Sequence, residues 1–488
     1  MKIMRYTFFS VCLIWLCMGC NGFLDEVPTA QQATVNYYKT AEDAVRGVTA
    51  AYRLMKDQAY AGYSPSSFGD VRSDDAHKGG GGASDQALLQ QLKLFTAGPE
   101  NGYVFNAWRD NFRGVFLANT ILQKVPPIAM DAKLKTRVLA EAYFLRAYYY
   151  FQLVRLFERV PLLLEPLENG KYDVPQSEAT VVLAQVEADL QIAMQGLESK
   201  AQQQKENYGR ATEGAARALL LELYMWQHRW VDAQQIGDEI MQSKAYSLVN
   251  DVTEIWTIAG EFGSESIFEV NCENIPGKGT GNLLNLFMNP RNTWGYGFIV
   301  PSKSLVAAFE PGDPRLTATV IQHGQLLPDG TIANTAASET GYWNRKYWLP
   351  KDQIPTATGG TNADGPTNDR IFGLAQVMLW TAEAAYHNGN ISYATSLVNR
   401  IRERARKHSG NTDMTILPAY ARVTLAQIYQ EMRVETALGE HRRFYELVRT
   451  GRAAAVLPNF KKGIHERLPI PLSEIQLSAG LLKQNIGY

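Results

Sequence analysis

The sequence contains no residue pattern that is typical of a catalytic or metal-binding site. After residue 20 there is no HExxH, CxxC, GxSxG or Walker A motif, and no two of the seven histidines stand four residues apart. Asp74, Asp75 and His77 offer oxygen and imidazole ligands for a divalent metal, but adjacent polar residues beside Gly79–Gly82 are usually just a solvated loop. We therefore predict a protein that is not an enzyme and has neither a cofactor nor a metal.

Two further patterns resemble parts of phosphate-binding or hydrolytic sites. The run from Gly277 to Gly281 has the glycine content of a phosphate-binding loop, but it lacks the required spacing and a helix signal after it. The 49 acidic residues guarantee many accidental carboxylate pairs, and the sequence cannot place two of them at the separation that glycoside hydrolysis needs. A helical glycoside hydrolase stays open only as an alternative.

Aromatic side chains in polar, glycine-containing loops are the strongest sign of a ligand. Trp294, Tyr296, Tyr342 and Trp343 stand in such loops, whereas Tyr143, Tyr148–Tyr150, Tyr224 and Trp226 stand in predicted helices, where packing explains them. Flat rings on exposed loops can stack on the apolar faces of sugars, while neighbouring Asn and Arg side chains hydrogen-bond hydroxyl groups. The loop aromatics therefore predict a contact surface for a ligand.

Composition excludes several classes of partner. The 48 basic and 49 acidic residues give a net charge of −1, so there is no basic surplus for a nucleic acid. A hydrophobic fraction of 45% over 488 residues is enough for a large core. Apart from the leader, no apolar run approaches the ~18 residues that span a bilayer.

The first 20 residues predict export and a lipid anchor. Lys2 and Arg5 precede an apolar run from Thr7 to Met18, and Gly19-Cys20 follows, as in a bacterial lipoprotein signal. We predict a signal peptide over 1–19 and acylation of Cys20, which would hold the protein on a membrane. The alternative is an ordinary secretory signal in which Cys20 is incidental. Cys272 is then the only other cysteine of the exported chain, so no disulfide framework is expected.

The elements that position these loops are predicted to be helices. Between residues 137 and 157 apolar side chains recur in steps of three and four, which is the pattern of a buried helix face. Leu221-x2-Tyr224-x8-Ala233 and Ala382-x2-Ala385-x8-Ala394 share the spacing of a tetratricopeptide hairpin, with turns at 227–229 and 388–390. Helices are expected at 40–58, 104–124, 133–157, 178–198, 212–227, 230–243, 370–388, 391–407 and 423–448.

Two stretches, 60–103 and 246–369, are rich in Gly, Pro and Asn and are predicted to be irregular. Long loops inside a compact protein are usually functional. We divide the chain into the leader 1–19, an N-terminal helical region 20–245, an irregular subdomain 246–369 and a C-terminal helical region 370–488.

Both ends of the chain and one central helix resemble the SusD/RagB family, the surface lipoproteins that bind nutrients for a TonB-dependent outer-membrane transporter. The matching segments cover most of the chain in order; they are Cys20–Pro28, Ala140–Tyr150 with Val160-Pro161-Leu162, Leu468–Ile475 and Gln484–Tyr488. The resemblance implies a mainly α fold with about four tetratricopeptide-like hairpins and an irregular, loop-rich subdomain that shapes the ligand site.

The same resemblance implies function and location. We expect a lipid-anchored outer-membrane protein facing the cell surface, which binds an oligosaccharide without breaking it and passes it to a SusC-like transporter. A peptide ligand in the same fold is one alternative, and a tetratricopeptide scaffold that binds only protein is another.

The resemblance also places the ligand face, loosely, in residues 70–105 and 285–348. Within those ranges the side chains suited to hydroxyl groups and sugar rings are Asp74, Asp75, Asn101, Tyr103, Asn289, Arg291, Trp294, Tyr296, Tyr342 and Trp343. These ten residues are the predicted ligand contacts.

Overall fold

The computed structural model describes residues 38–57, 65–167, 174–275, 278–291, 293–355, 365–407 and 413–488. The predicted leader and Cys20 lie outside these residues. The helices of the described part are α3 Ala41–Asp57, α4 Pro65–Gly69, α5 Ala87–Leu94, α6 Gly102–Lys124, α7 Ala132–Phe157, α8 Ala179–Gly196, α9 Glu213–Trp226, α10 Trp230–Gln242, α11 Leu283–Met288, α12 Lys303–Val306, α13 Arg315–Thr319, α14 Leu374–His387, α15 Ile391–Arg406, α16 Leu425–Thr436, α17 Arg443–Arg449, α18 Ala453–Val456 and α19 Leu472–Leu477. Four short 3-10 turns accompany them, η1 Lys205–Asn207, η2 Glu254–Trp256, η3 Ile258–Gly260 and η4 Lys351–Gln353.

The strands are short and form two-stranded antiparallel ribbons. Within the described residues the pairs are β1–β5, β2–β3, β4–β8 and β6–β7. Their bounds are β1 Ala76–Gly79, β2 Val160–Pro161, β3 Gln176–Ser177, β4 Ser266–Val270, β5 Phe298–Pro301, β6 Val320–Ile321, β7 Trp343–Asn344 and β8 Asp369–Gly373. The fold is therefore mainly α with an irregular region, as predicted.

Each helix expected from periodicity is present near its predicted position, with two corrections. The helix expected at 370–388 begins only at Leu374, because residues 369–373 form β8 and pair with β4. The helix expected at 423–448 is two helices, α16 and α17. Leu438 and His441 lie between them with φ of 59° and 55°, a left-handed conformation that interrupts a helix.

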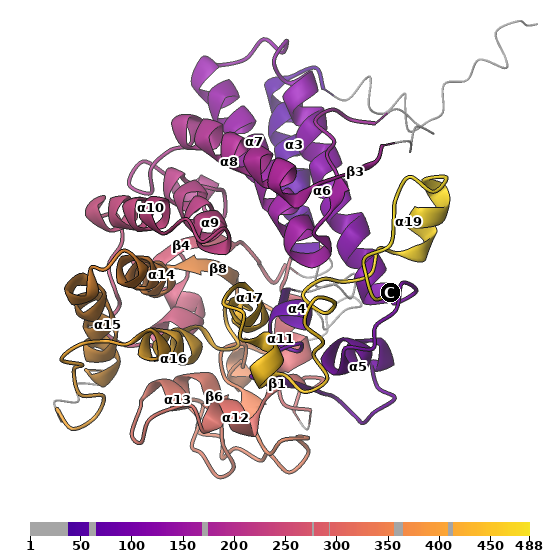
Figure 1. Ribbon diagram of the computed structural model, residues 1–488. Helices are drawn as coiled ribbons and strands as arrows, with labels where there is room; N and C mark the ends of the chain where they lie inside the picture. The colour runs from indigo at the N-terminus through magenta and orange to yellow at the C-terminus, as the bar shows by residue number, and fades with distance from the viewer. Residues whose placement is uncertain are drawn as a thin grey trace, which may run out of the picture.

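α7 is the centre of the N-terminal part and is buried on nearly all sides over its second half. Its neighbours α3, α6 and α8 surround it (Figure 1). Gly114 of α6 lets the two backbones approach, because a Cβ at that position would lie 2.3 Å from the ring of Tyr149. Asp131 caps the start of α7 by accepting a hydrogen bond from the N–H of Leu134.

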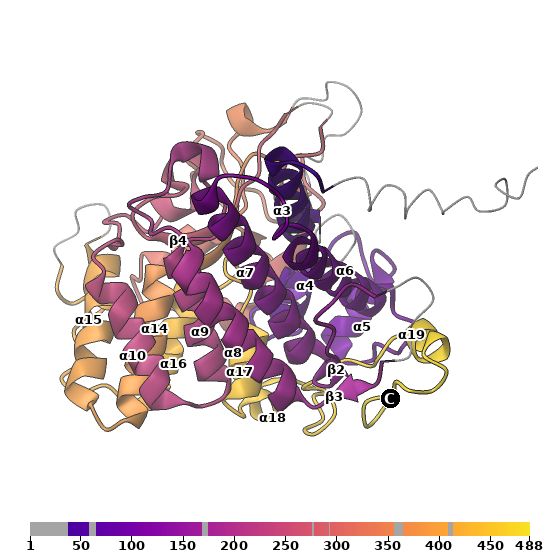
Figure 2. The ribbon, with the colours of Figure 1, turned by 90° about the horizontal axis from the view of Figure 1, so that it is seen from above.

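Two helical hairpins follow, and both match the spacing found in the sequence. α9 and α10 are joined through residues 227–229, and α14 and α15 through 388–390. The hairpins pack on each other through α10 and α14, which lie side by side in Figure 2. Gly237 makes this contact close, since a Cβ there would lie 1.9 Å from Oγ1 of Thr381.

Ion pairs attach the irregular region to the helices. Arg443 at the start of α17 binds Asp74, Arg433 of α16 binds Asp75, and Arg315 of α13 binds Glu431 of α16. The end of the chain is fastened to α7, because the side-chain amide of Asn485 donates to the carbonyl of Phe157.

Candidate ligand-binding surface

The two irregular stretches meet at a ribbon of two strands. β1 pairs with β5, with His77 opposite Val300 and Gly79 opposite Phe298, and the N–H of Gly80 donates to the carbonyl of Gly297 at 2.8 Å. The predicted ligand-face ranges 70–105 and 285–348 are thereby brought together. We call the surface formed by residues 77–85, 291, 293–298 and 339–342 the loop junction.

The glycine run after Lys78 has a structural role in this junction. Gly79 has φ of 73°, and a Cβ there would lie 2.3 Å from the carbonyl oxygen of Gly297. The Nζ of Lys78 donates to the carbonyl oxygens of Gly79, Gly82 and Asp85 at 2.7–2.8 Å. The ammonium group therefore holds the glycine loop in a tight turn.

Tyr296 is the most accessible aromatic ring of the junction, at 46% exposed. Edge contacts with Phe287 and Phe298, at centroid distances of 6.1 and 6.5 Å, orient its ring. Arg291 lies next to it, donating to the carbonyl of Tyr296 at 3.2 Å and pairing with Asp85 at 3.2 Å. The arrangement places a fixed ring beside an exposed guanidinium and a carboxylate.

Trp294, Tyr342 and the pair His77–Glu339 complete the junction. Trp294 is half-buried, and its indole Nε1 has no hydrogen-bond partner among the described residues. Tyr342 is also half-buried. Glu339 lies 3.3 Å from Nδ1 of His77 and accepts from the N–H of Gly79 at 3.0 Å. The hydrogen bond with His77 lowers the pKa of Glu339, against the opposite effect of burial.

Trp343 is not the exposed ring that the sequence predicts. It is 1% exposed, and its indole N–H donates to the carbonyl of Asn334 at 3.0 Å. The pairing of β7 with β6 turns the ring into a small hydrophobic cluster with Val300 and Ile321. Trp343 therefore supports the loop junction from inside.

Asp74 and Asp75 are also engaged within the protein. Arg443 donates to both oxygens of Asp74 at 2.8 and 3.0 Å, and Arg433 donates to Asp75 at 2.7 Å. Burial acts to raise the pKa of Asp74, but the hydrogen bonds from Arg443 outweigh it and lower that pKa. The pKa of the fully buried Asp75 is raised by burial. Both carboxylates join the loop to the C-terminal helices.

Asn101, Tyr103 and Asn289 are buried and satisfied by local contacts. Asn101 caps α6 by accepting from the N–H of Tyr103, whose hydroxyl donates to Gln86 at 3.0 Å. Burial raises the pKa of the Tyr103 phenol to about 12. The Asn289 amide donates to the carbonyl of Tyr347 at 3.0 Å. Because Asn101, Tyr103 and Asn289 are buried, the structure does not support the prediction that they contact a ligand directly.

Sequence reasoning missed Asp85, Phe287, Phe298 and Glu339. The alternation of Tyr296 and Phe298 at the start of a strand was a usable signal for the aromatic cluster. Asp85 and Glu339 had no local signal, since their partners Arg291 and His77 are more than 200 residues away in the chain.

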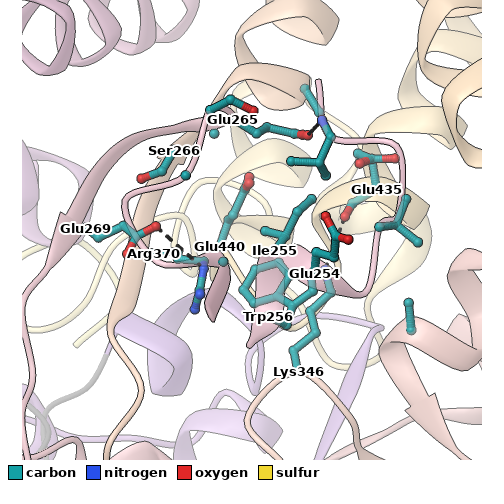
Figure 3. A pocket seen from close by; sticks show the side chains of 18 of the residues that line it. Glu254, Ile255, Trp256, Glu265, Ser266, Glu269, Lys346, Arg370, Glu435 and Glu440 are labelled. Atoms are coloured by element: carbon teal, nitrogen blue, oxygen red, sulfur yellow. Dashed lines mark hydrogen bonds and ion pairs between the residues drawn. The ribbon is translucent and has the colours of Figure 1, made fainter. Parts of the chain in front are cut away.

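Several cavities border the irregular region, and two of them lie at its contacts with the helices. One has a volume of about 620 Å³ and borders the loop junction at His77 and Glu339. The other, about 260 Å³, lies between η2, β4 and α16 and is drawn in Figure 3. The Nε of Arg370 lies 3.7 Å from Glu269, along the dashed line, and the ammonium of Lys346 lies 4.2 Å from the ring centroid of Trp256.

Much of the charge in this second cavity is taken up within the protein. Arg404 donates to Glu265 and Glu435, and burial raises the pKa of Glu440 to about 7. Ion pairs beside this cavity therefore join the irregular region to the helices. Among the described residues no group of three or more His, Cys, Asp or Glu side chains is placed to hold a metal ion.

The stacked hairpins and the loop junction place this protein in a class of helical scaffolds that carry an irregular surface with aromatic side chains. Two family models match this chain. One, described as starch-binding and associating with the outer membrane, matches residues 22–225, and the other, the SusD family, matches residues 264–463. The chain belongs to the SusD family.

Individual relatives agree with this assignment. SusD-like protein P25 of Formosa agariphila is 25% identical, over 98% of each chain. The solved structure of a laminarin-binding SusD-like protein is 32% identical with a TM-score of 0.83, and the match covers 92% of this chain and 100% of that one. Surface glycan-binding protein A from Bacteroides thetaiotaomicron, solved in complex with laminarihexaose, is 25% identical with a TM-score of 0.78 over 92% of this chain and 100% of its own.

The described helices are not suited to crossing a membrane. None of them combines sufficient length with sufficient apolar character to cross a bilayer.

Proposed function

We propose that this protein is a cell-surface lipoprotein that binds an oligosaccharide at the loop junction. It hands the ligand, without breaking a bond, to a TonB-dependent outer-membrane transporter. Membership of the SusD family supports the proposal, as do the names of its relatives, which are laminarin-binding and surface glycan-binding proteins. The acylation of Cys20 and the surface-facing orientation are parts of the same proposal and rest on the leader sequence.

The observation that carries the proposal is the exposed, oriented ring of Tyr296 beside Arg291 and Asp85. A ring held at its edges by Phe287 and Phe298 keeps a face for a sugar ring. The guanidinium and the carboxylate supply a donor and an acceptor for hydroxyl groups. Little conformational freedom is lost on binding, because these side chains already contact one another.

We assign the direct contacts among the predicted residues to Arg291, Trp294, Tyr296 and Tyr342, which are exposed or half-buried. Asp85 and Glu339 join them. Asp75, Asn101, Tyr103, Asn289 and Trp343 are buried, and in this proposal they hold the loops in position. Asp74 is paired with Arg443 and lines the neighbouring cavity.

The test is a binding screen by calorimetry that includes laminarin oligosaccharides, followed by Tyr296→Ala on the best ligand. Removing the ring should lower affinity by about 1–2 kcal/mol, the scale of a lost aromatic contact. The matched control is Tyr208→Ala, because Tyr208 is 37% exposed and contacts Phe262 but lies outside the junction. Unchanged affinity in Tyr296→Ala would remove the proposed platform.

Three further outcomes separate this function from its alternatives. Binding of peptides rather than glycans in the same screen would favour a peptide-binding member of the family. Release of reducing ends from a bound glycan would contradict a non-catalytic role. Failure of repeated gentle-detergent purifications to recover a large β-barrel transporter would count against the handover step.

A further inference from the structure

The cavity of about 620 Å³ beside the loop junction has an unusual set of charges. It lies between β1, the end of α5, the start of α12 and residues 456–459. Its volume is within the ~300–1,000 Å³ range of small-molecule sites. Three cationic side chains that line it, Arg72, Lys93 and Lys303, have no ion pair with any described residue.

Arg72 is the buried member of the three, at 2% exposed. Its Nη2 donates to the carbonyl of His465 at 2.7 Å, and its guanidinium carbon lies 3.9 Å from the ring centroid of Phe444. Its Nη1 is buried and has no hydrogen-bond partner among the described residues. A charged donor that is buried and unpaired is costly, so an acceptor on a ligand that reached this nitrogen would stabilise it.

Lys93 and Lys303 add positive charge to the same space. The Nζ of Lys93 donates to the neutral carbonyl oxygens of Ser73 and Ala76 at 2.6 and 2.7 Å, and the carboxylates of Asp74, Asp75 and Glu339 act on it only from a distance. Burial lowers the pKa of Lys93 to about 8, so the group is still mostly protonated at neutral pH. Lys303 is exposed.

The carboxylates that line the cavity do not cancel these charges. Asp74 is compensated by Arg443 and Arg433, whereas Glu339, bound by His77 and by the N–H of Gly79, leaves one negative charge against the three cations. Glu466 contributes to the field at Arg72 but forms no ion pair with it. The cavity is therefore cationic on balance.

One wall of the cavity is apolar. Leu94 is 41% exposed, and Phe95, Leu457 and Pro458 continue the same wall. A space with an apolar wall and buried cationic donors suits a sugar residue that carries an acidic substituent, since the ring has an apolar face and the substituent accepts charge-assisted hydrogen bonds.

The cavity and the loop junction share the His77–Glu339 pair, so one extended ligand can reach both. We propose that this cavity is a subsite for an anionic group, a carboxylate or a sulfate ester, on the oligosaccharide that the protein binds. The inference rests on the proposed glycan-binding function and adds the chemical class of the ligand.

The experiment compares three oligosaccharides by calorimetry on the purified full chain. They are a uronic acid tetrasaccharide, the same tetrasaccharide with its carboxyl groups reduced to neutral alcohols, and a sulfated galactose tetrasaccharide. We expect either the uronic acid or the sulfated tetrasaccharide to bind about tenfold more tightly than the neutral tetrasaccharide. A tenfold difference in affinity is the size of effect that one charge-assisted hydrogen bond produces. Added salt should reduce this preference. The two acidic oligosaccharides distinguish carboxylate from sulfate.

Two substitutions locate the effect. Arg72→Gln should abolish the preference for the acidic oligosaccharide, with circular dichroism to check folding, because Arg72 also contacts Phe444. Lys303→Gln is the second variant, since Lys303 is exposed and its loss should leave the fold intact while reducing the preference about threefold. The matched control, Lys205→Gln, changes an exposed lysine that does not line the cavity and should leave the preference unchanged.

Equal affinity for acidic and neutral oligosaccharides would overturn the inference and leave the proposed glycan-binding function standing. A preference for the acidic oligosaccharides that survives in both variants would also overturn the inference. Tighter binding of a glutamate tetrapeptide than of the uronic acid tetrasaccharide would overturn it as well. If no oligosaccharide binds, the proposed function fails, and the subsite is judged by titration with free glucuronate and with sulfate. Saturable binding of either anion that weakens in Lys303→Gln then supports the anionic subsite. Absence of binding of both anions overturns it.

Discussion

Trp343 fills a small hydrophobic cluster beneath the loop junction, while Tyr296 lies on the outside of the same junction. Trp343→Ala should lower the free energy of unfolding by about 3–5 kcal/mol, because it removes a buried ring and leaves a cavity. Tyr296→Ala should change it by about 1 kcal/mol or less. Urea denaturation of both variants measures the difference. Equal stability of the two variants would mean that Trp343 is not a core residue.

His441 connects three segments of the chain through two buried hydrogen bonds and an ion pair. Its Nδ1 lies 2.6 Å from Asp70, and its Nε2 lies 2.9 Å from the hydroxyl of Tyr347 and 3.6 Å from Asp369. Burial alone would lower the pKa of His441, but Asp70 and Asp369 outweigh it and raise the pKa to about 9. Protonated His441 therefore stabilises the folded protein.

The raised pKa of His441 predicts how the stability of the protein depends on pH. Because the folded pKa is above the unfolded one, the stabilisation is complete below pH ~6.5 and is lost as pH rises through ~9. The stability difference between wild type and His441→Gln should shrink over this window by an amount on the order of 1–3 kcal/mol. Urea denaturation at several pH values provides the measurement. A difference that stays constant with pH would show that His441 is not charged in the folded state.

At the scale of elements, the contact between α6 and α7 depends on Gly114. A methyl group there would meet the ring of Tyr149, which is itself held by a 2.6 Å hydrogen bond from its hydroxyl to the carbonyl of Ala51. Gly114→Ala should therefore destabilise the protein by about 1–3 kcal/mol, although alanine is the better helix former by about 1 kcal/mol.

Gly102→Ala in the same helix is the matched control for Gly114→Ala. A Cβ at Gly102 lies 3.4 Å from Leu88, which is close to ordinary contact, so this variant should be near neutral. Thermal denaturation of both variants gives the comparison. A neutral or stabilising Gly114→Ala would show that the ring of Tyr149 can move aside at little cost.

At the scale of the whole molecule, the proposed anchor decides where the binding surface works. Cys20→Ala should abolish labelling by a fatty-acid analogue and release the protein from membranes or leave it unprocessed, because acylation requires that thiol. Cys272→Ala is the control, since Cys272 is buried and should not affect labelling. Cell fractionation with metabolic labelling makes the measurement. Labelling and membrane retention that persist in Cys20→Ala would place the anchor elsewhere or exclude it.

The helices and their turns were predictable from the sequence because the interactions that define them are local. The apolar spacing of α7, its Asp131 cap and the matching offsets of the two hairpins each involve residues within a few turns of one another. The break between α16 and α17 was missed for the opposite reason. His441 lies in that break and is bound to Asp70, 371 residues earlier in the chain.

The ligand surface was predictable only as two stretches of the chain. Tyr296 and Trp343 stand in similar polar loops, and the sequence does not distinguish them. The pairing of β6 with β7 buries one ring, and the contacts of Phe287 and Phe298 leave the other exposed. Asp74 resembles a free loop carboxylate until Arg443, 369 residues away, is placed beside it. Exposure and charge compensation depend on contacts between residues far apart in the sequence, and the folded chain alone decides them.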